Sequence, residues 1–146
     1  MTTIAYKDGV ISCDSRETED TTIVDDDCDK RLVKKGVQFF CSGSSCDAEN
    51  LASWYLGETF YTKEMDEIYS IVIDNSVVLT VGYGDKRGFY KNTERQANYF
   101  AIGSGAHHAI TAMDMGCDSK EAVEMASKRD AMTGGKIKSY KVDALI

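Results

Sequence analysis

Thr2 stands directly behind Met1 at the start of the segment MTTIAYKDGVISCDSRET. Removal of Met1 would place a hydroxyl and a free α-amine on this one residue, and these groups are a nucleophile and a base. The ordinary pKa of an α-amine is about 8, and a nearby lysine ammonium would lower it, so that the neutral amine could accept the hydroxyl proton. A carboxylate would have to hold the lysine, and attack on an amide needs N–H donors for the developing oxyanion.

The sequence supplies one candidate for each of these parts. Thr2 begins the first expected strand, Asp14 ends the second and Lys30 begins the third. If these strands are neighbours, the three side chains meet at one end of the sheet. Gly43 follows the fourth strand, where its backbone N–H could face a substrate carbonyl. Each residue taken alone also fits a turn or a solvated surface position, so the interpretation depends on their combination.

Two hairpins are expected in the first third of the chain. An Asp-Gly pair between apolar runs is the strongest short hairpin signal, and such a pair occupies residues 8–9. A second turn is expected at Lys35-Gly36. The predicted strands of these hairpins are 2–7, 10–13, 30–33 and 37–42.

A helix is predicted over residues 48–60, because Leu51, Trp54 and Tyr55 recur at helical spacing. Asp47 is placed to favour the N-terminus of this helix. Further strands are expected at 67–74, 76–85, 88–92, 99–102 and 136–146.

Two helices are expected between the last two of these strands. The first follows a Gly-Ser-Gly loop whose spacing does not match a dinucleotide-binding motif. We expect Ser119 to cap the second, which carries Ala122, Val123 and Ala126 along one face. This order of elements predicts an α+β fold in which two helical layers bracket two sheets. Without proline, linker or internal repeat, residues 1–146 are expected to form a single domain.

Composition argues against several classes of function. The net charge of −7 disfavours nucleic acid as a partner, because phosphate neutralisation needs clustered Lys and Arg. No apolar run approaches the roughly 20 residues of a membrane span, and no signal-peptide pattern precedes Thr2. We therefore expect no membrane association and a cytoplasmic location.

Metal sites are also not indicated. The run from Glu17 to Asp29 carries seven carboxylates and no base, which predicts a solvated loop rather than a calcium-binding loop. The five cysteines lack C-x-x-C spacing, so neither disulfides nor a zinc site is suggested. His107 and His108 are adjacent, and neighbours on a helix do not face each other. No metal and no cofactor is expected.

Four segments together resemble proteasome β-type subunits, and the runs VVLTVGYGD and AIGSG most resemble their bacterial relative HslV, the peptidase of the HslUV system. The resemblance covers nearly the whole chain in the family's order, and the segments are TTIAYKDGVISCDSRET, DKRLVKKGVQFFCSGSSCDAE, FAIGSGAHHAI and AVEMASKRDAMTGGKIKSYKV. It implies the four-layer αββα sandwich of N-terminal-nucleophile hydrolases. The implied activity is that of a threonine endopeptidase which cleaves unfolded polypeptide inside a homo-oligomeric ring.

The same resemblance implies partners and a location. The ring would be hexameric or heptameric, single or stacked, and an AAA+ unfoldase would feed it. The implied location is the cytosol of a bacterium or of a phage-infected cell.

Roles at the reactive centre also follow from the resemblance. Thr2 matches the nucleophile, Asp14 and Lys30 match the pair that tunes it, and Gly43 matches the oxyanion donor. The hydroxyl and carboxylate positions that surround the terminal amine correspond to Ser104, Asp130 and Thr133.

The resemblance assigns five further residues near this centre. Arg16 matches a structural ion-pair partner, and Glu17 and Thr18 match positions whose backbone groups pair with an extended substrate. Cys28 and Cys41 match side chains that line the main specificity pocket, which implies a medium-sized and mildly apolar pocket.

Departures from the family pattern leave alternatives open. The segment between the first helix and strand 67–74 has room for one long helix where the family has two. The spacing from Lys30 to Gly43 is one residue short, so Arg31 competes for the lysine's position, although a guanidinium cannot be tuned in the same way. If Met1 is retained, Thr2 lacks its amine base, and the chain would be a non-catalytic structural subunit, for example of a phage particle or compartment shell. A small-molecule amide hydrolase with the same nucleophile is the third alternative.

Overall fold

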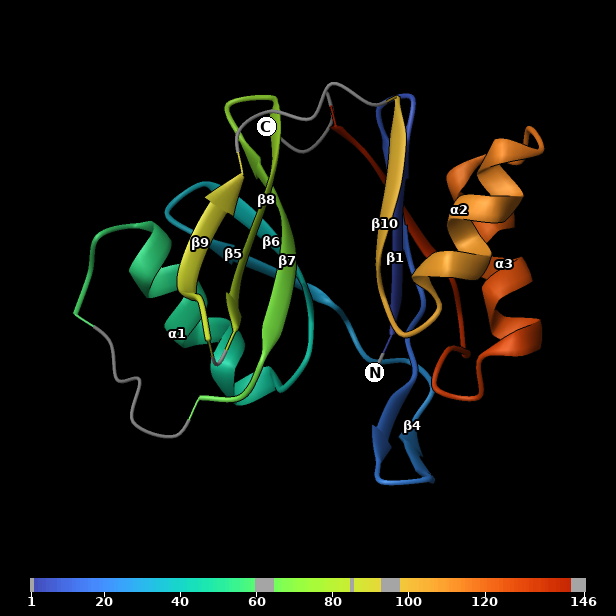
Figure 1. The fold of residues 1–146 in the computed structure, drawn as a ribbon, viewed down its shortest axis with the longest axis horizontal. Coiled ribbons are helices and arrows are strands. Elements are labelled where there is room, and N and C mark those ends of the chain that lie inside the picture. Colours follow the sequence, from blue (N-terminus) through green and yellow to red (C-terminus); the bar gives the residue numbers. More distant parts are fainter. Residues whose placement is uncertain (1, 60–64, 85, 93–97, 143–146) are drawn as a thin grey trace.

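The computed structural model describes residues 2–59, 65–84, 86–92 and 98–142. Two antiparallel sheets face each other, and each carries helix on its outer side, which gives four layers in the order helix, sheet, sheet, helix (Figure 1). The predicted α+β class and four-layer αββα sandwich are therefore confirmed.

The first sheet has four strands in the order β10-β1-β2-β11 and is covered by α2 and α3. Its central strands form the first predicted hairpin. The bounds of these elements are Thr3–Lys7 for β1, Val10–Cys13 for β2, Tyr99–Gly103 for β10, Lys138–Lys141 for β11, Ala106–Asp114 for α2 and Ser119–Arg129 for α3.

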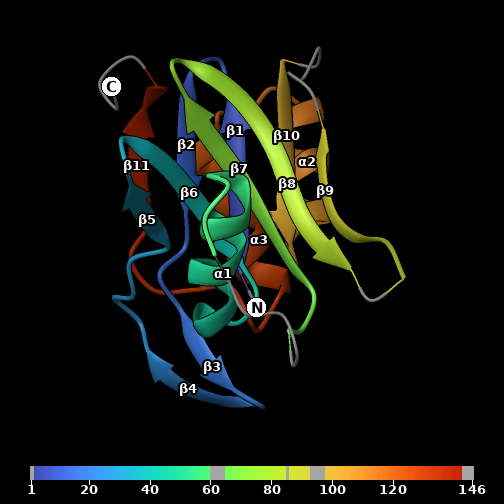
Figure 2. The ribbon, with the colours of Figure 1, turned by 90° about the vertical axis from the view of Figure 1, so that its left-hand side faces the viewer.

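The second sheet is a five-stranded meander in the order β5-β6-β7-β8-β9, and α1 lies on its outer face (Figure 2). Every adjacent pair in it is antiparallel. The bounds are Arg31–Lys34 for β5, Val37–Ser42 for β6, Ser45–Tyr55 for α1, Ile68–Asp74 for β7, Val77–Gly84 for β8 and Gly88–Asn92 for β9.

Both predicted hairpin turns are present and have the backbone geometry that two-residue turns require. Asp8 and Gly9 have φ of 49° and 80°, and Lys35 and Gly36 have φ of 52° and 77°. Positive φ at both central residues gives a turn whose twist matches that of the flanking strands. The turn chemistry therefore fixes the register of both hairpins.

Alternating side chains of the strands fill three separate apolar layers. In β1, Ile4 points between the two sheets while Ala5 points toward α2 and α3. In β6, Phe40 points between the sheets and Phe39 packs against Leu51 of α1. The helix side of the first sheet is filled mainly by alanine, which allows helix and sheet to approach closely.

One helix lies between β6 and β7 within residues 43–59 and 65–67, in keeping with the shortened layer expected from the sequence. It begins at Ser45 and ends at Tyr55, so the predicted bounds of 48–60 were too late at both ends. Asp47 lies in its first turn and accepts a hydrogen bond from the backbone N of Asp66 at 3.2 Å. In the part of the chain that the structure describes, no helix has the length and apolar character needed to cross a membrane.

The acidic segment is mostly exposed to solvent, as its charge predicted, but part of it is a hairpin and not a loop. Residues Glu17–Glu19 and Thr22–Asp25 form the hairpin β3–β4, which projects from one end of the sandwich (Figures 1 and 2). The carboxylate of Asp27 then pairs with Lys136 and Lys138, at 3.4 and 3.2 Å. Arg16, which pairs with Asp26, directly precedes the run, whereas Lys136 and Lys138 come from the C-terminal part of the chain, which the local sequence could not show.

The N-cap of α3 is Asp118 and not the predicted Ser119. The Asp118 carboxylate accepts from the backbone N of Glu121 at 2.8 Å, and the Glu121 carboxylate accepts from the backbone N of Asp118 at 3.0 Å. This reciprocal pair is a capping box. Ser119 instead turns inward, where its hydroxyl bonds that of Ser12 at 2.8 Å.

Replacement of the cap tests this assignment. Asp118→Ala removes the bond that the Asp118 carboxylate accepts from the backbone N of Glu121, and we expect it to lower the free energy of unfolding by about 1 kcal/mol. Asp118→Asn is the matched control, because an asparagine side chain caps as well as an aspartate. Urea unfolding measures both. Equal losses in the two variants would show that the capping bond contributes little.

Candidate active site

The antiparallel pairing of β1 and β2 brings Thr2 and Asp14 to the same end of the first sheet. Ile4 pairs with Cys13, so the residues just before Ile4 lie beside the residue just after Cys13. The Thr2 hydroxyl donates a hydrogen bond to Oδ1 of Asp14. Both side chains are buried.

Asp14 also accepts bonds from three backbone N–H groups. Thr3 N donates to Oδ1 at 3.1 Å, Gly134 N donates to Oδ2 at 3.0 Å, and Arg16 N lies 3.4 Å from Oδ2. A buried carboxylate is tolerated when its lone pairs are used in this way. The group joins the start of β1, the end of β2 and the loop before β11.

Lys30 approaches the same region from the start of β5. Its Nζ donates a hydrogen bond to the backbone O of Arg16 at 2.6 Å, two residues beyond Asp14. Lys30 is therefore linked to the Asp14 segment through the backbone of Arg16. Lys30 also lines the pocket that contains Thr2.

A second polar cluster surrounds the backbone of Thr2 and Thr3. Ser104 Oγ donates to Oδ2 of Asp130 at 2.6 Å and lies 3.4 Å from the Thr2 carbonyl. Thr133 Oγ1 donates to the same carboxylate oxygen at 2.7 Å. Because that donation uses the Thr133 proton, the 2.7 Å contact between Thr3 and Thr133 must be donated by Thr3.

The hydrogen bonds to Asp130 lower the pKa of its carboxyl group. Burial by itself raises the pKa of the Asp130 carboxyl, but the bonds from Ser104, Thr133 and the backbone N of Met132 outweigh it and hold the pKa below its ordinary value. Asp130 is therefore charged at neutral pH and accepts hydrogen bonds only. The predicted residues Ser104, Asp130 and Thr133 lie together in the structure.

Three glycines allow the backbone to come this close. A Cβ on Gly103 would lie 2.0 Å from the Thr2 carbonyl oxygen, and one on Gly105 would lie 2.1 Å from Thr3 Oγ1. Gly43, which follows β6, has φ of +140°, a conformation that side chains disfavour. It lines the same pocket as Thr2.

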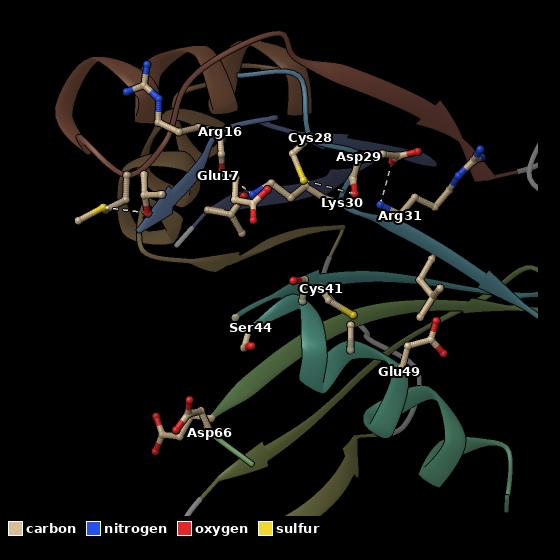
Figure 3. A pocket seen from close by; sticks show the side chains of 18 of the residues that line it. Arg16, Glu17, Cys28, Asp29, Lys30, Arg31, Cys41, Ser44, Glu49 and Asp66 are labelled. Atoms are coloured by element: carbon tan, nitrogen blue, oxygen red, sulfur yellow. Dashed lines mark hydrogen bonds between the residues drawn. The ribbon is translucent and has the colours of Figure 1, made fainter. Parts of the chain in front are cut away.

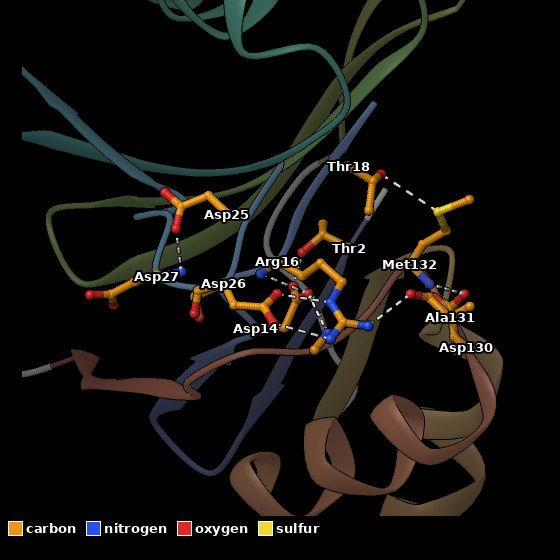
Figure 4. A network of polar contacts seen from close by, with 12 residues as sticks. Thr2, Asp14, Arg16, Thr18, Asp25, Asp26, Asp27, Asp130, Ala131 and Met132 are labelled. Carbon is orange, nitrogen blue, oxygen red and sulfur yellow. Dashed lines mark hydrogen bonds and ion pairs between the residues drawn. The ribbon is translucent and has the colours of Figure 1, made fainter. Parts of the chain in front are cut away.

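Arg16 braces the loop beside Asp14. Its guanidinium makes a bidentate pair with Asp26, with Nε to Oδ1 at 2.9 Å and Nη2 to Oδ2 at 3.2 Å, and Nη1 donates to the Ala131 carbonyl at 3.0 Å (Figure 4). The hydrogen bond with Asp26 raises the pKa of Arg16 and lowers that of Asp26. Gly134 lies against the guanidinium, since a Cβ there would be 2.4 Å from its central carbon.

A pocket of about 680 Å³ opens beside Thr2 (Figure 3). One wall comes from the β3 and β5 region and the other from the end of β6, from α1 and from the start of β7. Its lining includes eight of the residues predicted from the sequence, namely Thr2, Arg16, Glu17, Thr18, Cys28, Lys30, Cys41 and Gly43.

Both cysteines of the pocket are held in the thiol form. Burial raises the pKa of Cys41 to about 11, even though the 3.4 Å hydrogen bond with Ser70 lowers it and Glu49 raises it further. Burial also raises the pKa of Cys28. At neutral pH these side chains therefore behave as small, weakly polar groups.

Several site residues were not found from the sequence. Thr3 and Asp26 were read only as part of a strand and of an acidic loop, yet each bonds a predicted residue. Gly134 was assigned no role of its own, but its backbone N–H donates to Asp14 and its lack of a side chain makes room for Arg16. The segment RDAMTGG, which is part of the resemblance, contains this glycine. Among the described residues, no group of three or more His, Cys, Asp or Glu side chains is arranged to hold a metal ion.

Gly134→Ala tests the contact between Gly134 and Arg16. The added methyl group must displace the guanidinium, and we expect it to lower the free energy of unfolding by about 1–3 kcal/mol, as overpacking does. In an Arg16→Ala background the same change should cost clearly less. Urea unfolding of the four proteins completes the cycle, and an equal cost in both backgrounds would contradict the assignment.

The lowered pKa of Asp130 predicts that the free energy of unfolding depends on pH. Its pKa is lowered on folding, so its stabilising contribution is present above the unfolded pKa near ~4 and is lost as pH falls through the folded pKa. We therefore expect the Asp130→Asn variant, already less stable near neutral pH, to lose less stability than the wild type between about pH 5 and pH 3. Thermal unfolding at several pH values measures this. Parallel pH profiles for the two proteins would contradict it.

Known structures share this fold, although neither a family model nor a curated protein sequence matches the chain. The BPH protein of Thiobacillus denitrificans aligns with a TM-score of 0.64 and 15% identity over 95% of this chain, both alone and in complex with epoxomicin. The alignment covers 95% of the BPH chain alone and 96% of the BPH chain in the complex. HslV from Trypanosoma brucei aligns with a TM-score of 0.66 and 16% identity, over 95% of this chain and 97% of that one. The chain thus has the fold of the HslV-like N-terminal-nucleophile hydrolases that its motifs resemble.

Proposed function

We propose that this chain is a threonine-type peptidase subunit whose nucleophile is Thr2 after removal of Met1. The observation that carries the proposal is the position of Thr2, which bonds the buried Asp14 carboxylate and lines a pocket together with Lys30 and Gly43. A nucleophile, a cation and a candidate oxyanion donor at one end of two sheets are what amide hydrolysis requires.

In the proposed reaction, the Thr2 hydroxyl gives its proton to the α-amine of the same residue. The oxygen attacks the carbonyl carbon of the scissile amide, and the N–H of Gly43 stabilises the oxyanion. Collapse of this tetrahedral intermediate returns the proton to the leaving amine and leaves an ester on Thr2. Water then hydrolyses the ester by the same route. The positive charge of Lys30 keeps the amine neutral and basic.

Ser104, Asp130 and Thr133 are proposed to position the amine. Their hydrogen bonds reach the backbone of Thr2 and the side chain of Thr3, which fixes the start of β1. Removal of one of them should therefore weaken catalysis through misplacement of the nucleophile.

An extended polypeptide is the proposed substrate. The strand β3, with Glu17 and Thr18, pairs only with β4 in a two-stranded sheet, so it has a free edge, and these two residues line the pocket. An extended chain can add to such an edge through backbone bonds while its side chains enter the pocket. By resemblance to HslV, we propose that the subunits form a homo-oligomeric ring in the cytoplasm, supplied with unfolded chains by an AAA+ unfoldase.

Covalent labelling tests the nucleophile. Epoxomicin, which the Thiobacillus denitrificans protein binds, is the probe. We expect intact-mass spectrometry to show loss of Met1 and one epoxomicin adduct per chain, located on Thr2 by peptide mapping. Thr2→Ala should abolish the adduct, because it removes the attacking oxygen.

Thr22→Ala is the matched control, since Thr22 lies exposed on β4. An adduct that persists in Thr2→Ala would move the nucleophile elsewhere. Retained Met1, no adduct and no peptide cleavage in an assembled protein would overturn the proposal in favour of a non-catalytic structural subunit.

A further inference from the structure

The pocket beside Thr2 carries more acidic than basic side chains. Cys28 and Cys41 contribute the weakly polar wall that the resemblance implied, but the structure adds carboxylates from several elements. The basic residues of the lining are Arg16, Lys30 and Arg31. The acidic ones are Glu17, Asp20, Asp29, Glu49, Asp66 and Glu67.

The guanidinium groups of Arg16 and Arg31 contact partners that do not line the pocket. The Arg16 guanidinium is held by Asp26, which is not part of the lining. The Arg31 guanidinium lies over the Tyr140 ring at 4.5 Å and 3.5 Å from Oε1 of Gln38. Figure 3 shows the Arg31 side chain extending away from the labelled carboxylates.

Lys30 is the remaining basic residue of the described lining, and it lies at the Thr2 end of the pocket. Its Nζ is bonded to the Arg16 carbonyl, on the wall opposite α1 (Figure 3). In the far part of the pocket, from α1 to the start of β7, the charged groups among the described lining residues are the carboxylates of Glu49, Asp66 and Glu67. Low-dielectric walls that carry one sign of charge focus the potential into a cleft.

Glu49 is the carboxylate best placed to meet a side chain that enters past Thr2. It lies on α1 one residue after Ala48, and its charge acts on the thiol of Cys41. Its side chain is 62% exposed, and its ion pair with Lys34 is long, at 3.7 Å. Lys34 lies closer to Glu58, at 3.1 Å, and to the hydroxyl of Ser53, at 2.9 Å, so Glu49 keeps most of its capacity for another cation.

We infer that this pocket selects polypeptides with a lysine or arginine side chain next to the scissile bond, and that Glu49 is the specificity-determining residue. The inference rests on the proposed function, which places the scissile bond at Thr2. The aliphatic stem of such a side chain would pass between Cys28 and Cys41, and its charged end would reach Glu49. A neutral side chain would leave the charge of Glu49 uncompensated, and an acidic side chain would be repelled by it.

A binding experiment tests the selectivity without turnover. The protein is the assembled Thr2→Ala variant, and the probes are two fluorescent peptides that differ only in arginine or citrulline, its neutral isostere. We expect the arginine peptide to bind about five- to tenfold more tightly at low salt, with the difference shrinking in about 1 M salt. Glu49→Gln should bring the two affinities together, whereas Glu124→Gln, on the exposed face of α3, should not.

A cleavage experiment then separates this inference from the proposed function. With Thr2 intact, kcat/KM should be at least about fivefold higher for an arginine than for a leucine peptide, and Glu49→Gln should lower that ratio toward one. Cleavage without such a preference, or equal binding of arginine and citrulline, would overturn the inference and leave the peptidase standing. Preferential arginine binding without any cleavage or epoxomicin adduct would overturn the peptidase and leave a cation-selective pocket.

Discussion

The buried carboxylate of Asp14 is the constraint on which the structure around Thr2 depends. It binds the side chain of Thr2 and three backbone N–H groups from three separate segments. Hydrogen bonds to a charged acceptor contribute about 1.5–3 kcal/mol each, and an unsatisfied buried carboxylate is costly. The first strand, the second strand and the loop before β11 are therefore held in one arrangement, because only that arrangement satisfies the group.

A second carboxylate completes the framework from the other side of β1. Asp130 is reached through Ser104 and Thr133, so the start of the strand lies between two acids that both accept hydrogen bonds. The glycines at 103, 105 and 134 are needed because these contacts leave no space for a Cβ. Polar bonding and close backbone packing thus support each other around Thr2.

The sequence was most informative where structure is decided locally. The turns at Asp8-Gly9 and Lys35-Gly36 and the alanine face of α3 follow from rules that act over a few residues, and the structure confirms them. It was least informative where the partner is distant. The pairing of Asp27 with Lys136 and Lys138, which are more than a hundred residues away from it, was not predicted. The contact of Gly134 with the equally remote Arg16 was not predicted either.

The prediction for Ser119 failed for a different reason. Two neighbouring residues could each cap α3, and only the burial of the Ser119 hydroxyl against Ser12 decides between them. Likewise, the sequence could identify Thr2, Asp14 and Lys30 as candidates but could not show that Lys30 reaches Asp14 only through the backbone of Arg16. Such choices are made by packing between layers, which no local pattern records.

The raised pKa of the pocket thiols has a consequence for the chemoselectivity of this cavity. With a pKa of about 11 for Cys41, fewer than roughly one in a thousand of these sulfurs is a thiolate at neutral pH. Sulfur usually outcompetes oxygen for soft electrophiles, but here it is kept protonated. A soft electrophile that enters the pocket therefore meets two sulfurs in the protonated form, which reacts with it far more slowly than a thiolate would.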